Sequence, residues 1–257
     1  MTTETDALSL TVMGAGPAYT DRSGAVGAAY LVGHGGTRIV LDLGQGTFTR
    51  LAGTIEPSSL DAIVVSHLHP DHFVDLVPLR HYLRWEFTPG RRLRVLGPRE
   101  LAARIDALHA DPGFAAAAFD VEPISEGTPT QIGTLRIEAR KVFHTDESYG
   151  FRVSVGDGRP ALVYTGDCGR AEDLVPIIRS GDTLLSEVSF GTGPGDPEAA
   201  HLDGPTVGDL AARTGVARVL LTHLGMGHDR DATVESVRTR FSGPVGLVDP
   251  GFITSIA

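Results

Sequence analysis

The sequence has a single cysteine, Cys168, among its 257 residues, which excludes an internal disulfide. No apolar run approaches the ~20 residues that a membrane-spanning helix needs, so we expect no membrane segment. Residues 1–6 are polar and acidic, without the basic and apolar regions of a signal peptide. These absences together lead us to expect a cytoplasmic protein.

Positive charge is also scarce, with 22 Lys and Arg against 32 Asp and Glu and a net charge of −10. A long polyanion such as tRNA or DNA would meet an unfavourable field unless a local basic patch compensated for it. The dense basic run is Arg91-Arg92-Leu93-Arg94, which is more typical of a solvated turn before a strand. We therefore expect a small anionic substrate rather than a long nucleic acid.

Strand-like and helix-like segments alternate along the whole chain, without a linker or a short-period repeat. A hydrophobic content of 41% with 21% charged residues is typical of a globular protein. The pattern predicts one layered α/β domain over 1–257. Residues 111–129, rich in Pro, Gly and Ala, give no clear pattern. Strands are predicted over 8–13, 28–32, 38–43, 62–65, 93–96, 135–143, 151–155, 161–164, 183–185 and 218–221, with a short one at the C-terminus. Helices are predicted over 73–85, from Pro98, around 209–214 and over 233–241.

The strongest chemical signal is the hexapeptide His67-Leu68-His69-Pro70-Asp71-His72, which directly follows a buried strand. Imidazole and carboxylate groups suit zinc, and also iron or manganese. Pro70 fits a strand that turns into the start of a helix, because proline suits a first helical position. This turn would let the first two His reach one metal ion while Asp71 and His72 reach a second.

Three further candidates stand just past the ends of predicted strands. They are His144, Asp167 and His223, and each follows an apolar run. In layered α/β folds, sites gather at the carboxyl ends of strands, where loops converge. Their shared placement predicts that they complete two metal sites, whereas the other His, namely His34, His81, His109 and His228, are interpreted as structural or exposed.

The pattern His-x-His-x-Asp-His, followed by His144, Asp167 and His223, resembles the metallo-β-lactamase superfamily over nearly the whole chain. The resemblance implies an αββα sandwich with a two-metal cleft at one edge. It implies one metal on His67, His69 and His144, a second on Asp71, His72 and His223, and Asp167 bridging both. It also implies two divalent ions, zinc first, with manganese or iron as alternatives.

Further segments resemble the phosphodiesterase and ribonuclease Z branch of that superfamily. They are Gly14-Ala15-Gly16-Pro17, Ser148-Tyr149-Gly150-Phe151-Arg152 and His201-Leu202-Asp203-Gly204. In that branch a His at the place of His201 contacts the scissile phosphate, with Glu187 matching a carboxylate that could orient it; an ordinary loop His is the alternative. Asp42 matches the first motif of the superfamily, either as hydrogen-bonding support for the His loop or as a simple turn carboxylate.

The resemblance predicts a hydrolase in which Asp71 and His201 act in catalysis and a metal-bridging hydroxide attacks phosphorus. His144 and Asp167 are too close in sequence to enclose the tRNA-gripping arm of ribonuclease Z. The chain therefore looks closer to small phosphodiesterases, including cyclic-nucleotide phosphodiesterases. Because dimers are common in this branch, the resemblance also leads us to expect a homodimer. The alternatives are a lactonase or thioesterase on the same metals, a ribonuclease Z-like nuclease, a di-iron redox protein and a non-enzymatic metal-binding scaffold.

Overall fold

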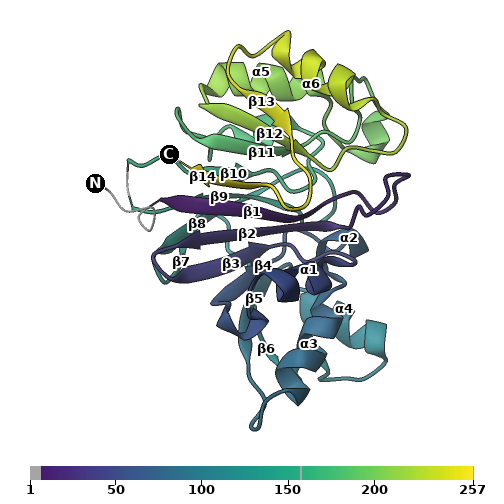
Figure 1. Cartoon of the computed structure of the whole chain (residues 1–257), viewed down its shortest axis with the longest axis vertical. Helices are drawn as coiled ribbons and strands as arrows, with labels where there is room; N and C mark the ends of the chain where they lie inside the picture. Colours follow the sequence, from purple (N-terminus) through teal and green to yellow (C-terminus); the bar gives the residue numbers. More distant parts are fainter. Residues whose placement is uncertain (1–6, 157, 257) are drawn as a thin grey trace.

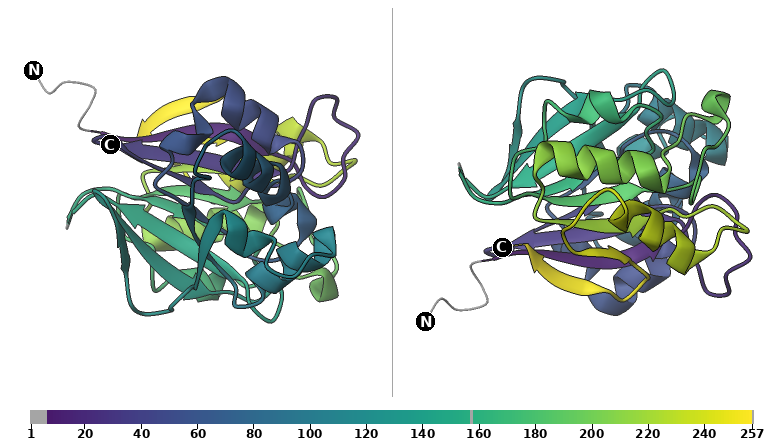
Figure 2. Two further views of the ribbon diagram at one scale, coloured as in Figure 1. Left: turned by 90° about the horizontal axis from the view of Figure 1, so that it is seen from below. Right: turned by 90° about the horizontal axis from the view of Figure 1, so that it is seen from above.

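The computed structural model describes residues 7–156 and 158–256. Residues 1–6, whose polarity supports the cytoplasmic expectation, lie outside the described residues. Two seven-stranded sheets pack face to face, and helices cover both outer faces (Figure 1). The two views in Figure 2 show the same layers from below and from above, with the last strand of the chain lying beside the first strand. The predicted α/β class and αββα layering are therefore confirmed.

The first sheet holds the N-terminal half of the chain together with the last strand. Its order is β14-β1-β2-β3-β4-β5-β6, and the pairs from β3 to β6 are parallel. Strand β14 returns from the C-terminus to pair antiparallel with β1. The strands are β1 (Leu8–Ala15), β2 (Ala28–His34), β3 (Thr37–Leu41), β4 (Ala62–Val64), β5 (Leu93–Gly97), β6 (Phe119–Pro123) and β14 (Ile253–Ile256).

The second sheet has the order β13-β12-β11-β10-β9-β8-β7. Strands β10 to β13 are parallel, whereas β7, β8 and β9 form an antiparallel meander. The strands are β7 (Thr130–Ile132), β8 (Leu135–Lys141), β9 (Tyr149–Ser154), β10 (Leu162–Tyr164), β11 (Thr183–Glu187), β12 (Arg218–Thr222) and β13 (Val245–Leu247).

Three apolar layers hold the sandwich together. One lies between the sheets, one lies under the helices of the first sheet, and one lies under α5 and α6 on the second sheet. The central strands are buried on both faces, so they read as continuous apolar runs. The helices are α1 (Thr47–Thr54), α2 (Pro70–Phe73), α3 (Leu76–Trp85), α4 (Leu101–His109), α5 (Gly204–Thr214) and α6 (Arg230–Arg238), and short 3₁₀ turns are Pro57–Ser59, Ala115–Ala117, Ala171–Leu174 and Pro197–Ala199.

The sequence missed some elements and misplaced others. Strands β6 and β7 were not predicted, because β6 lies in the Pro-, Gly- and Ala-rich segment and β7 has only three residues. The helix expected from Pro98 begins at Leu101, after a turn that Leu101 N closes by donating to the Pro98 carbonyl. The helix expected over 73–85 begins later, as α3 at Leu76, and the short helix α2 before it ends at Phe73. Among residues 7–156 and 158–256, the helices are all too short or too polar to cross a membrane.

Candidate metal centre

The hexapeptide loop leaves the buried strand β4 and turns directly into the short helix α2. Pro70 is the first residue of α2, and His69 precedes it with extended backbone. The loop packs closely on the turn after β3, where a Cβ atom on Gly44 would collide with the carbonyl oxygen of Asp71. Only glycine allows the two backbones to approach this closely. The predicted strand-to-helix turn is confirmed, and it carries the four candidate ligands of the hexapeptide.

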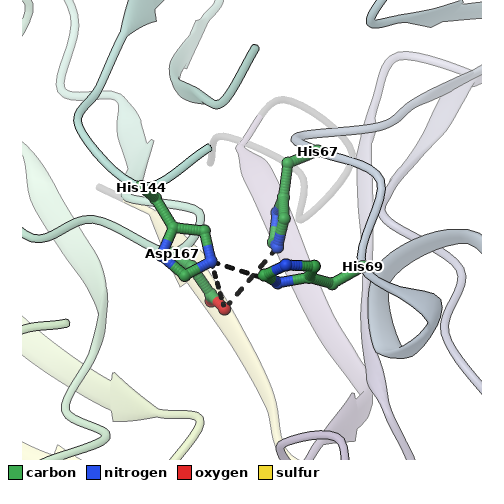
Figure 3. Close-up of side chains that lie close together, drawn as sticks. All are labelled: His67, His69, His144 and Asp167. Carbon is green, nitrogen blue, oxygen red and sulfur yellow. Dashed lines mark hydrogen bonds and ion pairs between the residues drawn. The ribbon is translucent and has the colours of Figure 1, made fainter. Parts of the chain in front are cut away.

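A first group of side chains converges at the edge of the sandwich. It consists of His67, His69, His144 and Asp167 (Figure 3). His144 Nε2 lies 3.1 Å from His69 Nδ1. Asp167 Oδ2 lies 3.7 Å from His67 Nε2 and 3.7 Å from His144 Nε2. Three loops, after β4, β8 and β10, thus bring their polar side chains to one point, as their placement past strand ends predicts.

A second group lies beside the first and shares Asp167 with it. It consists of Asp71, His72, Asp167 and His223, all of them buried. His223 Nε2 lies 3.1 Å from Asp71 Oδ2 and 3.3 Å from His72 Nε2. His72 Nε2 lies 3.4 Å from Asp167 Oδ2, and His223 Nε2 lies 3.6 Å from Asp167 Oδ1. The carboxylate of Asp167 therefore stands between the two groups.

The spacing and the unsatisfied atoms of the two groups fit metal ions. Zinc binds imidazole nitrogen and carboxylate oxygen at about 2.0–2.1 Å, which separates tetrahedral ligand atoms by about 3.3 Å. The pairs of donor atoms given above lie between 3.1 and 3.7 Å apart, and all donor atoms of each group lie within 4.8 Å of one another. His67 Nε2 and Asp167 Oδ1 are buried without a hydrogen-bond partner, which is costly for buried polar atoms. The groups suit two divalent cations, zinc among them, whereas ligation by these seven residues stays a prediction.

The backbone is strained at two positions of this edge. His223 has φ +57° and Asp42 has φ +59°, the left-handed region that residues other than glycine rarely adopt. His223 N donates to the Ala15 carbonyl at 2.9 Å, and Asp42 N donates to the Val64 carbonyl at 2.9 Å. Such strain costs about 1–3 kcal/mol per residue and persists where the surroundings fix it, as at functional sites.

The carboxylate of Asp42 supports the His loop from behind. Asp42 Oδ2 accepts hydrogen bonds from His72 Nδ1 at 2.7 Å and from Ser66 Oγ at 2.8 Å. It also accepts one from the Tyr164 hydroxyl at 2.7 Å, and Asp42 Oδ1 accepts one from Ser66 N at 2.6 Å. His72 therefore keeps Nε2 toward the second group. Of the two roles considered for Asp42, hydrogen-bonding support of this loop is the one observed.

His201 lies against the same centre and is held by Glu187. Glu187 Oε1 lies 2.9 Å from His201 Nδ1 and also accepts from Cys168 N at 2.8 Å. The His201 ring lies 4.7 Å from the ring of His144, and its Nδ1 lies 4.0 Å from Asp167 Oδ2. Burial alone would lower the pKa of His201, but the hydrogen bond and charge of Glu187 outweigh it and raise the pKa to about 9. The catalytic role of His201 stays a prediction.

Glu187, His201 and His223 form a third close group that shares His223 with the second. Both oxygens of Glu187 already accept hydrogen bonds, since Oε2 accepts from Ser189 Oγ at 2.6 Å and from Ser189 N at 3.1 Å. Ser189 Oγ also lies 3.0 Å from His223 Nδ1. This arrangement favours Glu187 as a support for His201 rather than as a ligand.

Burial sets the protonation of the imidazoles in the first group. It lowers the pKa of His67, His69 and His144. These three rings are therefore neutral at neutral pH, which is the form that ligates metal.

The second group behaves differently because carboxylates surround it. Burial would lower the pKa of His72, but the charges of Asp167 and Asp42 outweigh burial and raise it. Burial would raise the pKa of Asp167, but the charges of His223 and His72 hold it well below its usual range. A cation at this group would therefore displace a proton from an imidazole and take its place between the carboxylates.

Tyr164 is a member of the centre that the sequence did not reveal, as are Ser66 and Ser189. Tyr164 ends strand β10 within an apolar run, so it reads as a core residue. Two features of the sequence could have indicated its role. A buried tyrosine hydroxyl needs a hydrogen-bond partner, and Tyr164 stands three residues before Asp167. Cys168, the residue after Asp167, is fully buried, and burial raises its pKa.

The basic run before β5 is engaged by the neighbouring strand. Arg92 pairs with Asp120, and Arg94 Nη2 lies 2.8 Å from Glu122 Oε2. Because β5 and β6 are parallel neighbours, these pairs form across the sheet edge. Two of the three arginines of the run, Arg92 and Arg94, are therefore ion-paired along a strand edge, and Arg91 lies over the Phe87 ring.

Comparisons with known proteins agree with the fold and the hydrolase-type site described above. The family described as "Beta-lactamase superfamily domain" matches residues 37–224. An uncharacterised protein of Mycobacterium leprae is 34% identical over 218 residues, covering 83% of this chain and 76% of its own. The crystal structure of the metallo-β-lactamase fold protein YhfI of Bacillus subtilis has a TM-score of 0.86 at 25% identity and covers 97% of this chain and 99% of that chain. A ribonuclease Z of Pyrobaculum aerophilum is 28% identical over 278 residues, covering 95% of this chain and 96% of its own.

Proposed function

Because the chain belongs to the metallo-β-lactamase superfamily, we propose that it hydrolyses a small phosphodiester, such as a cyclic nucleotide, with two divalent cations. The B. subtilis relative is named a probable metallo-hydrolase, which supports the reaction type. One cation would be held by His67, His69 and His144, and the other by Asp71, His72 and His223, with Asp167 between them.

The cations and the chain have separate tasks in this reaction. When bound, two such cations supply an activated water for attack and neutralise negative charge on the substrate. Asp71 and Asp167 would offset only two of their four positive charges. The centre would therefore keep net positive charge, which suits a monoanionic diester.

The contact between Glu187 and His201 is the observation that favours a phosphodiester substrate over a lactone or thioester. Glu187 Oε1 engages His201 Nδ1 at 2.9 Å, so Nε2 is the nitrogen left to meet a substrate. An imidazole N–H beside the cations would donate to a phosphoryl oxygen or to the departing oxygen. A neutral lactone or thioester has less need of this extra donor, because its single carbonyl oxygen can be polarised by the cations.

A ribonuclease Z-like activity is the second candidate, supported by the 28% identity to the Pyrobaculum enzyme. The net charge of −10 opposes a long polyanion. The ion pairs of Arg92 and Arg94 neutralise most of the basic run that could have countered this charge. We therefore propose a small anionic substrate, and a homodimer stays a prediction.

A side-by-side assay tests the proposal. Zinc-loaded protein would be given cyclic AMP, bis(p-nitrophenyl) phosphate, a lactone and a tRNA precursor. Turnover of the two small phosphodiesters is expected. Turnover of the lactone alone would overturn the proposal, and turnover of the tRNA precursor alone would replace it with the nuclease alternative.

A further inference from the structure

Two cavities lie near the candidate metal centre, one lined by a ligand candidate and the other by the neighbour of a ligand candidate, and they differ in charge. One, of about 510 Å³, opens beside the ligand candidate His69. Its charged residues are two arginines and three carboxylates, namely Arg99, Arg104, Glu100, Asp146 and Glu147. The other, of about 300 Å³, has three arginines and one carboxylate, namely Arg22, Arg50, Arg230 and Asp249. We call the second cavity the arginine pocket; it is locally cationic in a chain with a net charge of −10.

The arginine pocket shares its wall with the backbone that carries His223. Leu224, the residue after His223, lines the pocket together with Ala15 and Gly16. His223 N donates to the Ala15 carbonyl, and the Arg22 guanidinium donates to the Leu224 carbonyl. The pocket therefore adjoins the second group of the metal centre.

The three guanidiniums come from separate segments of the chain. Arg22 lies in the loop between β1 and β2, Arg50 in α1 and Arg230 at the start of α6. Figure 1 shows the β1–β2 loop at the same edge of the sandwich as the segment that precedes α6. Side chains from three elements meet at this pocket, so it is a product of the tertiary fold rather than of one basic run.

Each guanidinium has donors beyond those that fix it. Arg50 Nη2 donates to the Gly24 carbonyl at 2.7 Å, and Arg230 Nη2 pairs with Asp249 Oδ2 at 2.6 Å. A guanidinium carries five N–H donors in a planar fork that matches phosphate oxygens. These bonds orient the side chains and leave further N–H groups for an anion.

We propose that the arginine pocket binds a second phosphate group of the substrate, so that the preferred substrate is a nucleotide diester carrying an additional terminal phosphate. This inference rests on the proposed phosphodiesterase function and defines the orientation in which the substrate binds. The terminal phosphate lies between Arg50 and Arg230, and the scissile diester lies at the metal centre. The uncharged nucleoside on the other side of the scissile bond extends toward the cavity beside His69.

Binding of two matched nucleotides tests the pocket without any reaction. Adenosine 3′,5′-bisphosphate and adenosine 3′-monophosphate differ by one 5′-phosphate, and neither contains a phosphodiester. By calorimetry, zinc-loaded protein is expected to bind the bisphosphate about tenfold or more tightly. The variant Arg50→Ala/Arg230→Ala is expected to bind both within about twofold. Equal affinity of the two nucleotides in the unmodified protein would overturn the inference.

The other cavity provides the matched control. Arg99→Ala/Arg104→Ala also removes two guanidiniums beside the metal centre, so it tests for a general loss of positive charge. This variant is expected to keep the preference for the bisphosphate. An equal loss in both double variants would contradict a specific site. If the first double variant folds poorly, Arg50→Gln and Arg230→Gln singly are expected to show smaller losses of the same kind.

A hydrolysis assay separates this inference from the proposed function. The dinucleotides ApA and pApA contain the same diester, and only pApA has a terminal phosphate. Preferential cleavage of pApA, lost in Arg50→Ala/Arg230→Ala, supports both. Equal cleavage of the two supports the phosphodiesterase and overturns the pocket. Arginine-dependent binding of the bisphosphate without cleavage of either dinucleotide, of cyclic AMP or of bis(p-nitrophenyl) phosphate supports the pocket and overturns the phosphodiesterase.

Discussion

The hydroxyl of Tyr164 donates a 2.7 Å hydrogen bond to Oδ2 of Asp42, and this bond joins the two sheets behind the metal centre. Tyr164 ends β10 in the second sheet, whereas Asp42 follows β3 in the first. The same oxygen of Asp42 accepts from His72 Nδ1 at 2.7 Å. The Nδ1 side of the candidate ligand His72 is thus fixed by a buried series of hydrogen bonds that links the two sheets.

Replacing Asp42 tests whether this support matters for metal binding. Asp42→Ala removes the acceptor of His72 Nδ1, so the ring loses its fixed orientation and part of its basicity. Loss of such a partner typically costs about 10–100-fold in metal affinity. Competition with a chromogenic chelator would measure the affinity. Unchanged affinity would mean that His72 does not depend on Asp42.

Tyr164→Phe tests the next residue in this series of hydrogen bonds, and Tyr30→Phe is its matched control. The two rings lie 4.9 Å apart, both hydroxyls are buried, and Tyr30 bonds Thr222 Oγ1 at 2.7 Å instead of Asp42. Each variant is expected to lose about 1 kcal/mol of unfolding free energy. Only Tyr164→Phe is expected to weaken the second metal detectably and to alter the visible spectrum of the cobalt-substituted protein. Equal spectra in the two variants would make the role of Tyr164 purely structural.

His201→Ala is expected to lower turnover of a phosphodiester by about 10²–10⁴-fold, the usual range for a lost proton-transfer group. Metal content is expected to stay the same, because Glu187 rather than a cation engages His201 Nδ1. Glu187→Gln should give a smaller loss, since it weakens the hold on the ring without removing it. Loss of metal from His201→Ala would instead assign the residue a structural or ligating role.

Arg152→Ala tests the fold apart from the metal centre. Arg152 belongs to the segment that resembles the phosphodiesterase branch, yet it forms a buried bidentate pair with Asp182 at 2.7 and 2.9 Å. Breaking such a pair leaves a buried charge and costs about 3–5 kcal/mol. Arg213→Ala removes an exposed pair with Glu172 and should cost less than about 1 kcal/mol. Denaturant unfolding would compare the two variants, and equal costs would contradict this interpretation.

The sequence predicted the parts of the site that are local or lie at strand ends. The hexapeptide needs only a strand-to-helix turn, and His144, Asp167 and His223 stand where strands of a layered fold converge. The contact of Tyr164 with Asp42 joins residues 122 positions apart on different sheets, so the local sequence pattern cannot identify Asp42 as the partner of the Tyr164 hydroxyl.

The edge strand β6 could not be predicted from the sequence for a different reason. Strand β6 has mostly exposed or half-buried residues beyond Phe119, so its apolar pattern is weak. Arg92, just before β5, and Arg94, on β5, form ion pairs with Asp120 and Glu122 of β6. A strand supported by its neighbour in this way cannot be recognised from its own residues alone.

The metal content of the purified protein tests the central claim most directly. Elemental analysis of zinc-loaded protein is expected to find about two ions per chain, as the two His/Asp groups predict. His144→Ala and His223→Ala should each reduce the content to about one, because His144 belongs only to the first of the two His/Asp groups and His223 only to the second. A single ion per chain in the unmodified protein, or none, would contradict the two-metal centre.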